Sequence, residues 1–206
     1  MRRKKTGYIL LTLLVITGLA GTISGSISGK ERKFAASLMK STSMDVLKSI
    51  NGLSKKQLDF KITKEQWSAR ECIYHIAASE NGLWKWLEAA LKSPANPEKR
   101  SDIKLTDKQL VKILEDRTNK FKTTESLEPK NSRYKSIAEA IADFKQKRAQ
   151  HIEYIKSTTE DLRDHVVETD FGWIDGYQLY LLIASHSNRH MQQIDEIKAN
   201  PGFPRK

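Results

Sequence analysis

Two histidines near the end of the chain have the spacing of a metal-binding pair. His186 and His190 are four residues apart in the sequence HSNRH. On an α-helix such residues lie on one face, with about 5–6 Å between their β-carbons, so two imidazoles can share one ion. The same helical stripe carries the apolar residues Leu179, Ile183, Ile194 and Ile197. We therefore expect both imidazoles to point inward.

The pair alone leaves two interpretations open. It is not the HExxH helix of metalloproteases, because Ser187 follows His186. The two side chains could make ordinary hydrogen bonds at the rim of a helical bundle, or they could bind a metal that needs a further ligand. His75 is the third candidate ligand. On a helical wheel it lies at the edge of an apolar arc, beside Ser79 and Trp86.

The helices that would carry these histidines have clear start and stop signals. Capping-box patterns occur at residues 68–71, 136–139 and 175–178, and each predicts a helix start. The first helix should stop before Ser93-Pro94, and the last should stop at residues 200–202, Asn-Pro-Gly. His75 thus falls on the first of these helices, and His186 and His190 fall on the last.

Two more helices are expected. One runs from about residue 31 to 50 and is broken by Asn51-Gly52; a shorter one runs from 107 to about 120. Residues 121–135 read as a polar loop. Long segments with helical period, and no run of alternating β-branched residues, predict an all-α protein built as a four-helix bundle.

The first 29 residues have the order of an export signal. Four positive charges at positions 2–5 precede an apolar run of 13 residues, Tyr8 to Ala20, and small residues follow to Gly29. We expect cleavage after Ala20. The alternative is an uncleaved anchor, because no charge occurs between Thr6 and Gly29. In either case the domain at 30–206 should be extracytoplasmic, with a membrane contact only through residues 1–29 if these remain.

The formal charge of +11 does not indicate nucleic-acid binding. The terminal cluster at positions 2–5 accounts for four of these charges, and the remaining lysines alternate with acidic residues. A DNA-binding domain would more often show a basic stripe and a docking motif. Cys72 is the only cysteine of the chain, so no disulfide can form within it.

Three separate segments resemble the DinB-like superfamily. They are the helix from Trp67 through His75 to Glu80, the segment from His186 through His190 to Gln193-Ile, and the closing Gly202-Phe203-Pro204. The similarity extends over about residues 34–204. Members of this superfamily, which includes bacillithiol transferases and mycothiol-dependent isomerases, are four-helix bundles with a divalent metal on three histidines.

The resemblance implies that His75, His186 and His190 bind one divalent ion, such as zinc, nickel, manganese or iron. An open coordination position on such an ion can activate water or a thiolate. This implies a metal-dependent thiol transferase or hydrolase acting on an unidentified small molecule or thiol. The alternative is a non-catalytic stress-response module that binds a metal or a small ligand. A homodimer is possible, and no catalytic residue beyond the metal ligands is identified.

Other residues of the motifs have simpler interpretations. Glu71 matches a recurrent position of the superfamily, but a capping role already accounts for it. Trp67 is expected to plug the helix entry, and Cys72 to fill space in the core. His151 and His165 match no motif and are expected at the surface.

Overall fold

The computed structural model describes residues 26–118 and 121–205. The expected cleavage after Ala20, and nearly all of the predicted export segment, lie outside these residues. The described chain begins just before the first helix, where the Ile27 side chain is already buried in the core at 5% exposure.

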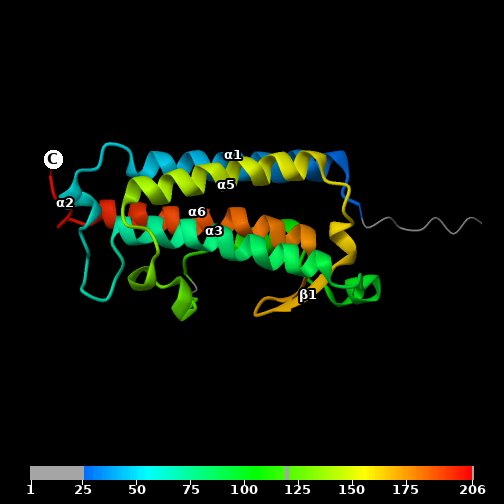
Figure 1. Cartoon of the computed structure of the whole chain (residues 1–206). Coiled ribbons are helices and arrows are strands. Elements are labelled where there is room, and N and C mark those ends of the chain that lie inside the picture. Colours follow the sequence, from blue (N-terminus) through cyan, green and yellow to red (C-terminus); the bar gives the residue numbers. More distant parts are fainter. Residues whose placement is uncertain (1–25, 119–120, 206) are drawn as a thin grey trace, which may run out of the picture.

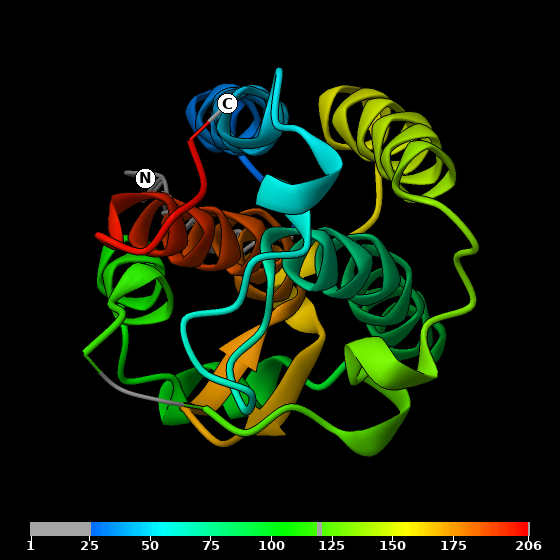
Figure 2. The same cartoon turned by 90° about the vertical axis from the view of Figure 1, so that its left-hand side faces the viewer.

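Four long helices run lengthwise beside one another (Figure 1). They are α1 (Gly29–Ile50), α3 (Ala69–Lys92), α5 (Ile137–Ser157) and α6 (Gly176–Ala199). Helix α6 packs against α1 and α3, and α5 packs against the same two helices from the other side. Viewed along the bundle, α6 is therefore next to α1 and α3 and lies diagonally across from α5 (Figure 2). This arrangement confirms the predicted helical bundle.

Local capping fixes the starts of these helices, largely as the sequence predicts. The Ser68 hydroxyl accepts the Glu71 N–H, and the Glu71 carboxylate accepts the Ser68 N–H at 2.8 Å. Helix α1 has an additional capping box, from Ser28 and Glu31. Ser136 also caps its helix, but the Glu139 carboxylate accepts from the N–H of residue 135 instead of closing a box.

The start of α6 differs from a full capping box in the same way. The Asp175 carboxylate accepts the Gln178 N–H at 2.8 Å, but the Gln178 amide donates to the Leu105 carbonyl. This bond ties α6 to the segment just before α4 (Asp107–Glu115), which packs along α6. Helix α4 is five residues shorter than the predicted 107–120, because its C-cap is Asp116.

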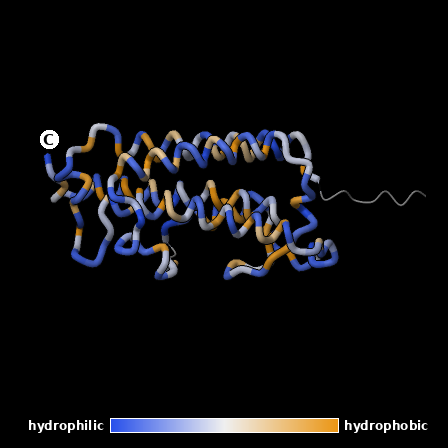
Figure 3. The backbone as a smooth tube through the Cα atoms, viewed as in Figure 1, coloured by the Kyte–Doolittle hydropathy of each residue, from blue (hydrophilic) through white to orange (hydrophobic). Residues whose placement is uncertain are grey.

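The N-terminal half of α6 is the centre of the main core. Its side chains Tyr177, Leu179, Tyr180, Leu181, Leu182 and Ile183 are all 5% exposed or less. They are covered on several sides because α1, α3 and α4 all pack on this helix. Hydrophobic stretches recur between hydrophilic ones along the long helices, as expected for helices with one buried face (Figure 3). Within residues 26–118 and 121–205, no helix is long and apolar enough to cross a membrane.

A two-stranded antiparallel hairpin precedes α6, so the expectation of an all-α fold is wrong in this detail. Strand β1 (Val166–Thr169) pairs with β2 (Gly172–Asp175), with Val166 opposite Asp175 and Thr169 opposite Gly172. Gly172 has a φ of 92° at the turn, a conformation that side chains other than glycine rarely adopt. The hairpin directs the chain into α6 through the Asp175 cap.

The remaining elements are short. They are α2 (Lys55–Leu58) and the 3-10 turns η1 (Pro97–Asp102), η2 (Glu125–Leu127), η3 (Pro129–Asn131) and η4 (Leu162–Asp164). The turns η2 and η3 lie within the stretch predicted as a polar loop. Both pack against α3, so this loop is held on the bundle near the predicted metal ligand of that helix.

A buried polar network joins the four long helices. The Arg148 guanidinium donates to the Glu80 carboxylate at 2.6 Å, to the Ser187 hydroxyl at 2.7 Å and to the Thr42 hydroxyl at 3.0 Å. Arg148 and Glu80 are each 1% exposed at their side chains. The network thus links α5 to α3, α6 and α1 in the interior.

The prediction that His151 and His165 lie at the surface is wrong for His151, while His165 is partly exposed. His151 is 1% exposed; its Nδ1 lies 2.7 Å from a Glu80 oxygen, and its ring stacks on Trp84 at 4.0 Å between centroids. His165 is partly buried, and its Nδ1–H donates to the Ala90 carbonyl at 3.0 Å. The hydrogen-bond partners of these two rings are 71 and 75 positions away in the chain, so neighbouring residues give no sign of them.

Candidate metal centre

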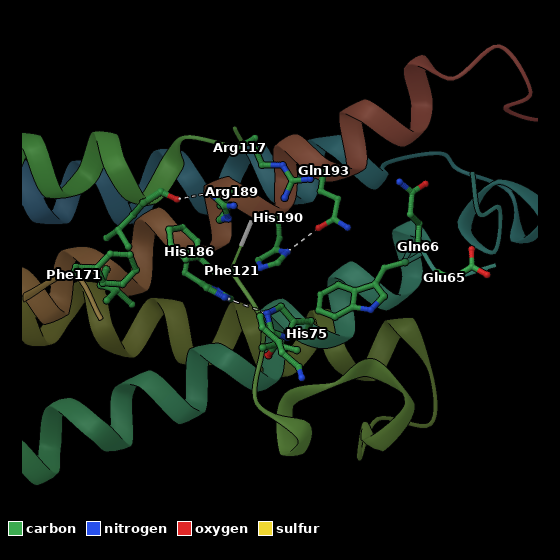
Figure 4. A pocket seen from close by; sticks show the side chains of 15 residues that line it. Glu65, Gln66, His75, Arg117, Phe121, Phe171, His186, Arg189, His190 and Gln193 are labelled. Carbon is green, nitrogen blue, oxygen red and sulfur yellow. Dashed lines mark hydrogen bonds between the residues drawn. The ribbon is translucent and has the colours of Figure 1, made fainter. Parts of the chain in front are cut away.

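The structure brings His75, His186 and His190 together between α3 and α6. One ring nitrogen from each lies within 4.8 Å of one from each of the others. The three rings point toward one another, although His75 is 111 residues from His186 in the chain (Figure 4). The packing of α3 against α6 therefore brings His75 to the pair that His186 and His190 form on α6.

The distances within the group suit ligands of one ion. The Nε2 atoms of His75 and His186 are 3.1 Å apart. Zinc–nitrogen bonds of about 2.0–2.1 Å in a tetrahedron place two ligand nitrogens roughly 3.3 Å apart. Little rearrangement is needed for both nitrogens to coordinate the same ion.

Hydrogen bonds on the far side of two rings set the tautomer that a ligand needs. The Nδ1 of His75 lies 2.9 Å from the Leu127 carbonyl, and the Nδ1 of His190 lies 3.0 Å from Oε1 of Gln193. A carbonyl oxygen only accepts, so each Nδ1 carries the proton and each Nε2 keeps its lone pair. Such outer bonds are usual behind metal-binding histidines.

The electrostatic environment keeps the three imidazoles neutral. Burial lowers the pKa of His75, although its bond to the Leu127 carbonyl partly opposes this. Burial and then the neighbouring His190 and His75 hold the pKa of His186 well below its usual value. Burial, followed by His75, does the same for the pKa of His190. Only neutral imidazoles coordinate a metal, so the site favours the competent protonation state at neutral pH.

The other residues of the recognition motifs surround this centre. Trp67 packs against His75 at 4.8 Å and stacks on His190 at 5.7 Å between ring centroids, so it forms a wall of the site as well as a plug at the helix entry. Glu71 has the expected capping role and also pairs with Lys61 at 2.8 Å. Cys72 is fully buried, and burial raises the pKa of its thiol, as expected of a core filler.

A pocket of about 410 Å³ opens beside the three histidines (Figure 4). This volume is in the range of small-molecule sites. Besides the histidines it is lined by Glu65, Gln66, Trp67, Leu114, Arg117, Phe121, Lys122, Thr123, Phe171, Leu182, Arg189 and Gln193. Sequence reasoning found Trp67 and Gln193 of this wall but not its remaining residues. Arg117, Phe121, Lys122 and Thr123 follow α4, and Phe171 lies at the hairpin turn, so they are far in sequence from the histidine motifs.

Two arginines of the wall are held in place by defined partners. The Arg117 guanidinium forms two hydrogen bonds with the Glu196 carboxylate, at 3.0 and 2.8 Å. Arg189 donates to the carbonyls of Leu114 and Asp116 at the end of α4. Burial lowers the pKa of Arg189, and the nearby charge of Arg117 lowers it further.

Comparisons with known proteins agree with this geometry. The family model of the DinB superfamily matches residues 38–194. The uncharacterized protein YuaE of Bacillus subtilis (strain 168) is 26% identical over 169 residues, which cover 79% of this chain and 96% of YuaE.

A solved structure shares the fold. YfiT from Bacillus subtilis aligns with a TM-score of 0.58 and 14% identity, over 87% of this chain and 92% of its own. It is described as a probable metal-dependent hydrolase with an unusual four-helix bundle topology. The family match extends over most of the chain and includes all three histidines. This chain belongs to the DinB superfamily.

Proposed function

We propose that this protein holds one divalent metal ion on His75, His186 and His190 and uses it in a metal-dependent hydrolysis or thiol-transfer reaction. The observation that carries the proposal is the convergence of three imidazole nitrogens within 4.8 Å. Three imidazoles suit zinc, nickel or iron, and no carboxylate belongs to this group. When bound, such an ion supplies a Lewis acid that activates water or a thiolate.

The residues of the chain prepare the site for that ion. Leu127 and Gln193 orient two of the rings through their Nδ1 atoms, and Trp67 fixes the positions of His75 and His190 by contact. The pocket gives a small molecule access to the same nitrogens, because all three histidines line it. A purely structural metal site is usually closed by a fourth protein ligand. Access to the ligands therefore favours a catalytic role over metal storage.

The alternative is a module that binds a metal or a small ligand without catalysis. Exchange at the metal distinguishes a closed structural site from an open one. We expect a cobalt-substituted sample, titrated with small thiols, azide or imidazole, to change its visible spectrum, because each would enter the free coordination position. A spectrum unchanged by all three would indicate a closed site, and the enzyme proposal would then be abandoned for the structural one.

We also propose that the bundle acts outside the cytoplasm. The support is the order of charges, apolar run and small residues in the first 29 positions. An exported thiol transferase could not draw on a cytosolic thiol, so export favours hydrolysis or a different thiol.

A further inference from the structure

The pocket beside the histidines has more cationic than acidic side chains in its lining. Its lining includes three cationic side chains, Arg117, Lys122 and Arg189, and one acidic side chain, Glu65. A bound divalent ion would make the pocket more positive still.

The position of Arg117 makes it suited to bind a ligand. Glu196 takes the Nε–H and one Nη2–H of the guanidinium, which carries five N–H donors in all. Arg117 lines the pocket and Glu196 does not. The salt bridge thus fixes the orientation of the guanidinium at the pocket wall and uses two of its five donors.

The same pocket also has an apolar part, which is made by aromatic residues. Phe121 is 48% exposed although it is a large hydrophobic residue. Its ring contacts Phe171 edge to face at 5.2 Å between centroids, and Arg189 lies 4.7 Å from the ring centre. Trp67 and Leu182 continue the apolar lining toward the histidines. An exposed aromatic group at a pocket mouth is suited to cover an apolar part of a ligand.

We infer that this site takes a small organic anion, a carboxylate or a phosphate monoester with an aromatic or branched apolar body, and that Arg117 and Lys122 bind its charged group. Arginine matches both anions with two parallel hydrogen bonds, so the geometry does not separate them. The inference rests on the proposed function only for the reacting end of the ligand, which would meet the metal. The anion subsite is made by the chain alone.

Calorimetric titration of the full chain, purified metal-free, tests the subsite directly. The probes are 4-phenylbutyrate against its neutral amide, and 2-phenylethyl phosphate against 2-phenylethanol. We expect at least one anion to bind about tenfold or more tightly than its neutral partner, with an affinity that falls as salt increases. Tighter binding of the phosphate or of the carboxylate identifies the preferred anion.

Two variants and a matched control test which side chains bind the charged group of the ligand. Arg117→Gln should weaken the anion about 10- to 100-fold and leave the neutral partner unchanged, as expected for loss of charged hydrogen bonds. Lys122→Gln should have a smaller effect of the same kind. Arg100→Gln removes the same charge and a similar ion pair, with Asp164 at 3.1 Å, outside the pocket. It should change nothing.

The outcomes separate this inference from the metal proposal, because metal content is measured on the same samples. Equal affinity for anion and neutral partner in the metal-free protein overturns the inference, whatever the metal content. So does an anion preference that appears only with metal bound and survives Arg117→Gln, since the anion would then sit on the ion. An anion preference in a protein that binds no metal supports the subsite and contradicts the metal proposal.

Discussion

The Oε1 atom of Gln193 accepts the Nδ1–H of His190 at 3.0 Å, one turn along α6. This bond directs the Nε2 atom of His190 toward His75 and His186. The same helix thus supplies two proposed ligands and the group that orients one of them.

Gln193→Leu should weaken metal binding about 10- to 100-fold, because outer hydrogen bonds of ligating histidines have effects of this size. The dissociation constant for cobalt or zinc, measured by competition with a chelator, checks this. Gln192→Leu is the matched control, since Gln192 instead bonds Glu115 and Asn188. A loss of affinity as large in the control as in Gln193→Leu would contradict the role of Gln193.

The metal-free protein should lose stability as the pH falls below about 6.5, the ordinary histidine pKa. The folded state holds His75, His186 and His190 neutral, with lowered pKa values caused mainly by burial. The unfolded chain takes up protons first, so the free energy of unfolding decreases by up to about 1.4 kcal/mol per pH unit for each histidine. Above that pH their contribution is complete.

Urea unfolding at several pH values between 7.5 and 5 measures this slope. His186→Gln, which removes one of the three groups, should give a shallower slope. Equal stability of the wild-type protein across this range would show that the three rings are not held neutral.

The buried pair of Glu80 and Arg148 should be sensitive to single substitutions. Arg148→Met leaves the Glu80 carboxylate with His151 as its remaining side-chain hydrogen-bond partner and should cost about 3–5 kcal/mol in the free energy of unfolding. The double variant Glu80→Gln/Arg148→Met should recover part of this loss. Urea unfolding measures both.

An exposed ion pair provides the comparison. Arg133→Met breaks a pair with Asp143 in which the arginine side chain is 65% exposed, and it should cost about 1 kcal/mol or less. If Arg148→Met costs no more than Arg133→Met, the buried network does not stabilise the bundle as described.

The export proposal predicts a mature protein that begins near residue 21, because the apolar run is short and small residues follow it. N-terminal sequencing of the protein from its native cells checks the position. A chain that retains Met1 to Ala20 in the membrane fraction would favour the anchor, and an intact chain in the cytosol would contradict export.

Helix starts could be predicted because their signals are local. The Ser68 hydroxyl and Glu71 carboxylate act within one turn, so four positions of sequence suffice to recognise them. The pairing of His186 with His190 is equally local. The position of His75 beside His186 and His190 depends on the packing of α3 against α6. Only the resemblance to a known superfamily identified His75 as a partner of the other two.

The features that were not predicted depend on distant partners. His151 is buried because Glu80, 71 positions away, accepts its Nδ1–H, and spacing within its own helix gives no sign of this. The strands of the hairpin have four residues each, which is too short for alternation to be recognised. Arg117 and Phe121 follow the end of α4, and they become pocket residues only when α4 packs on α6.

The central claim is that His75, His186 and His190 together hold one ion. The most direct test is the metal content of the purified protein and its variants after loading and removal of excess metal, with helical content checked by circular dichroism. We expect about one ion per chain in the wild type and in His165→Ala, almost none in His186→Ala or His190→Ala, a severe loss in His75→Ala, and a helical spectrum in all. One ion per chain retained by the double variant His75→Ala/His190→Ala would contradict the assignment.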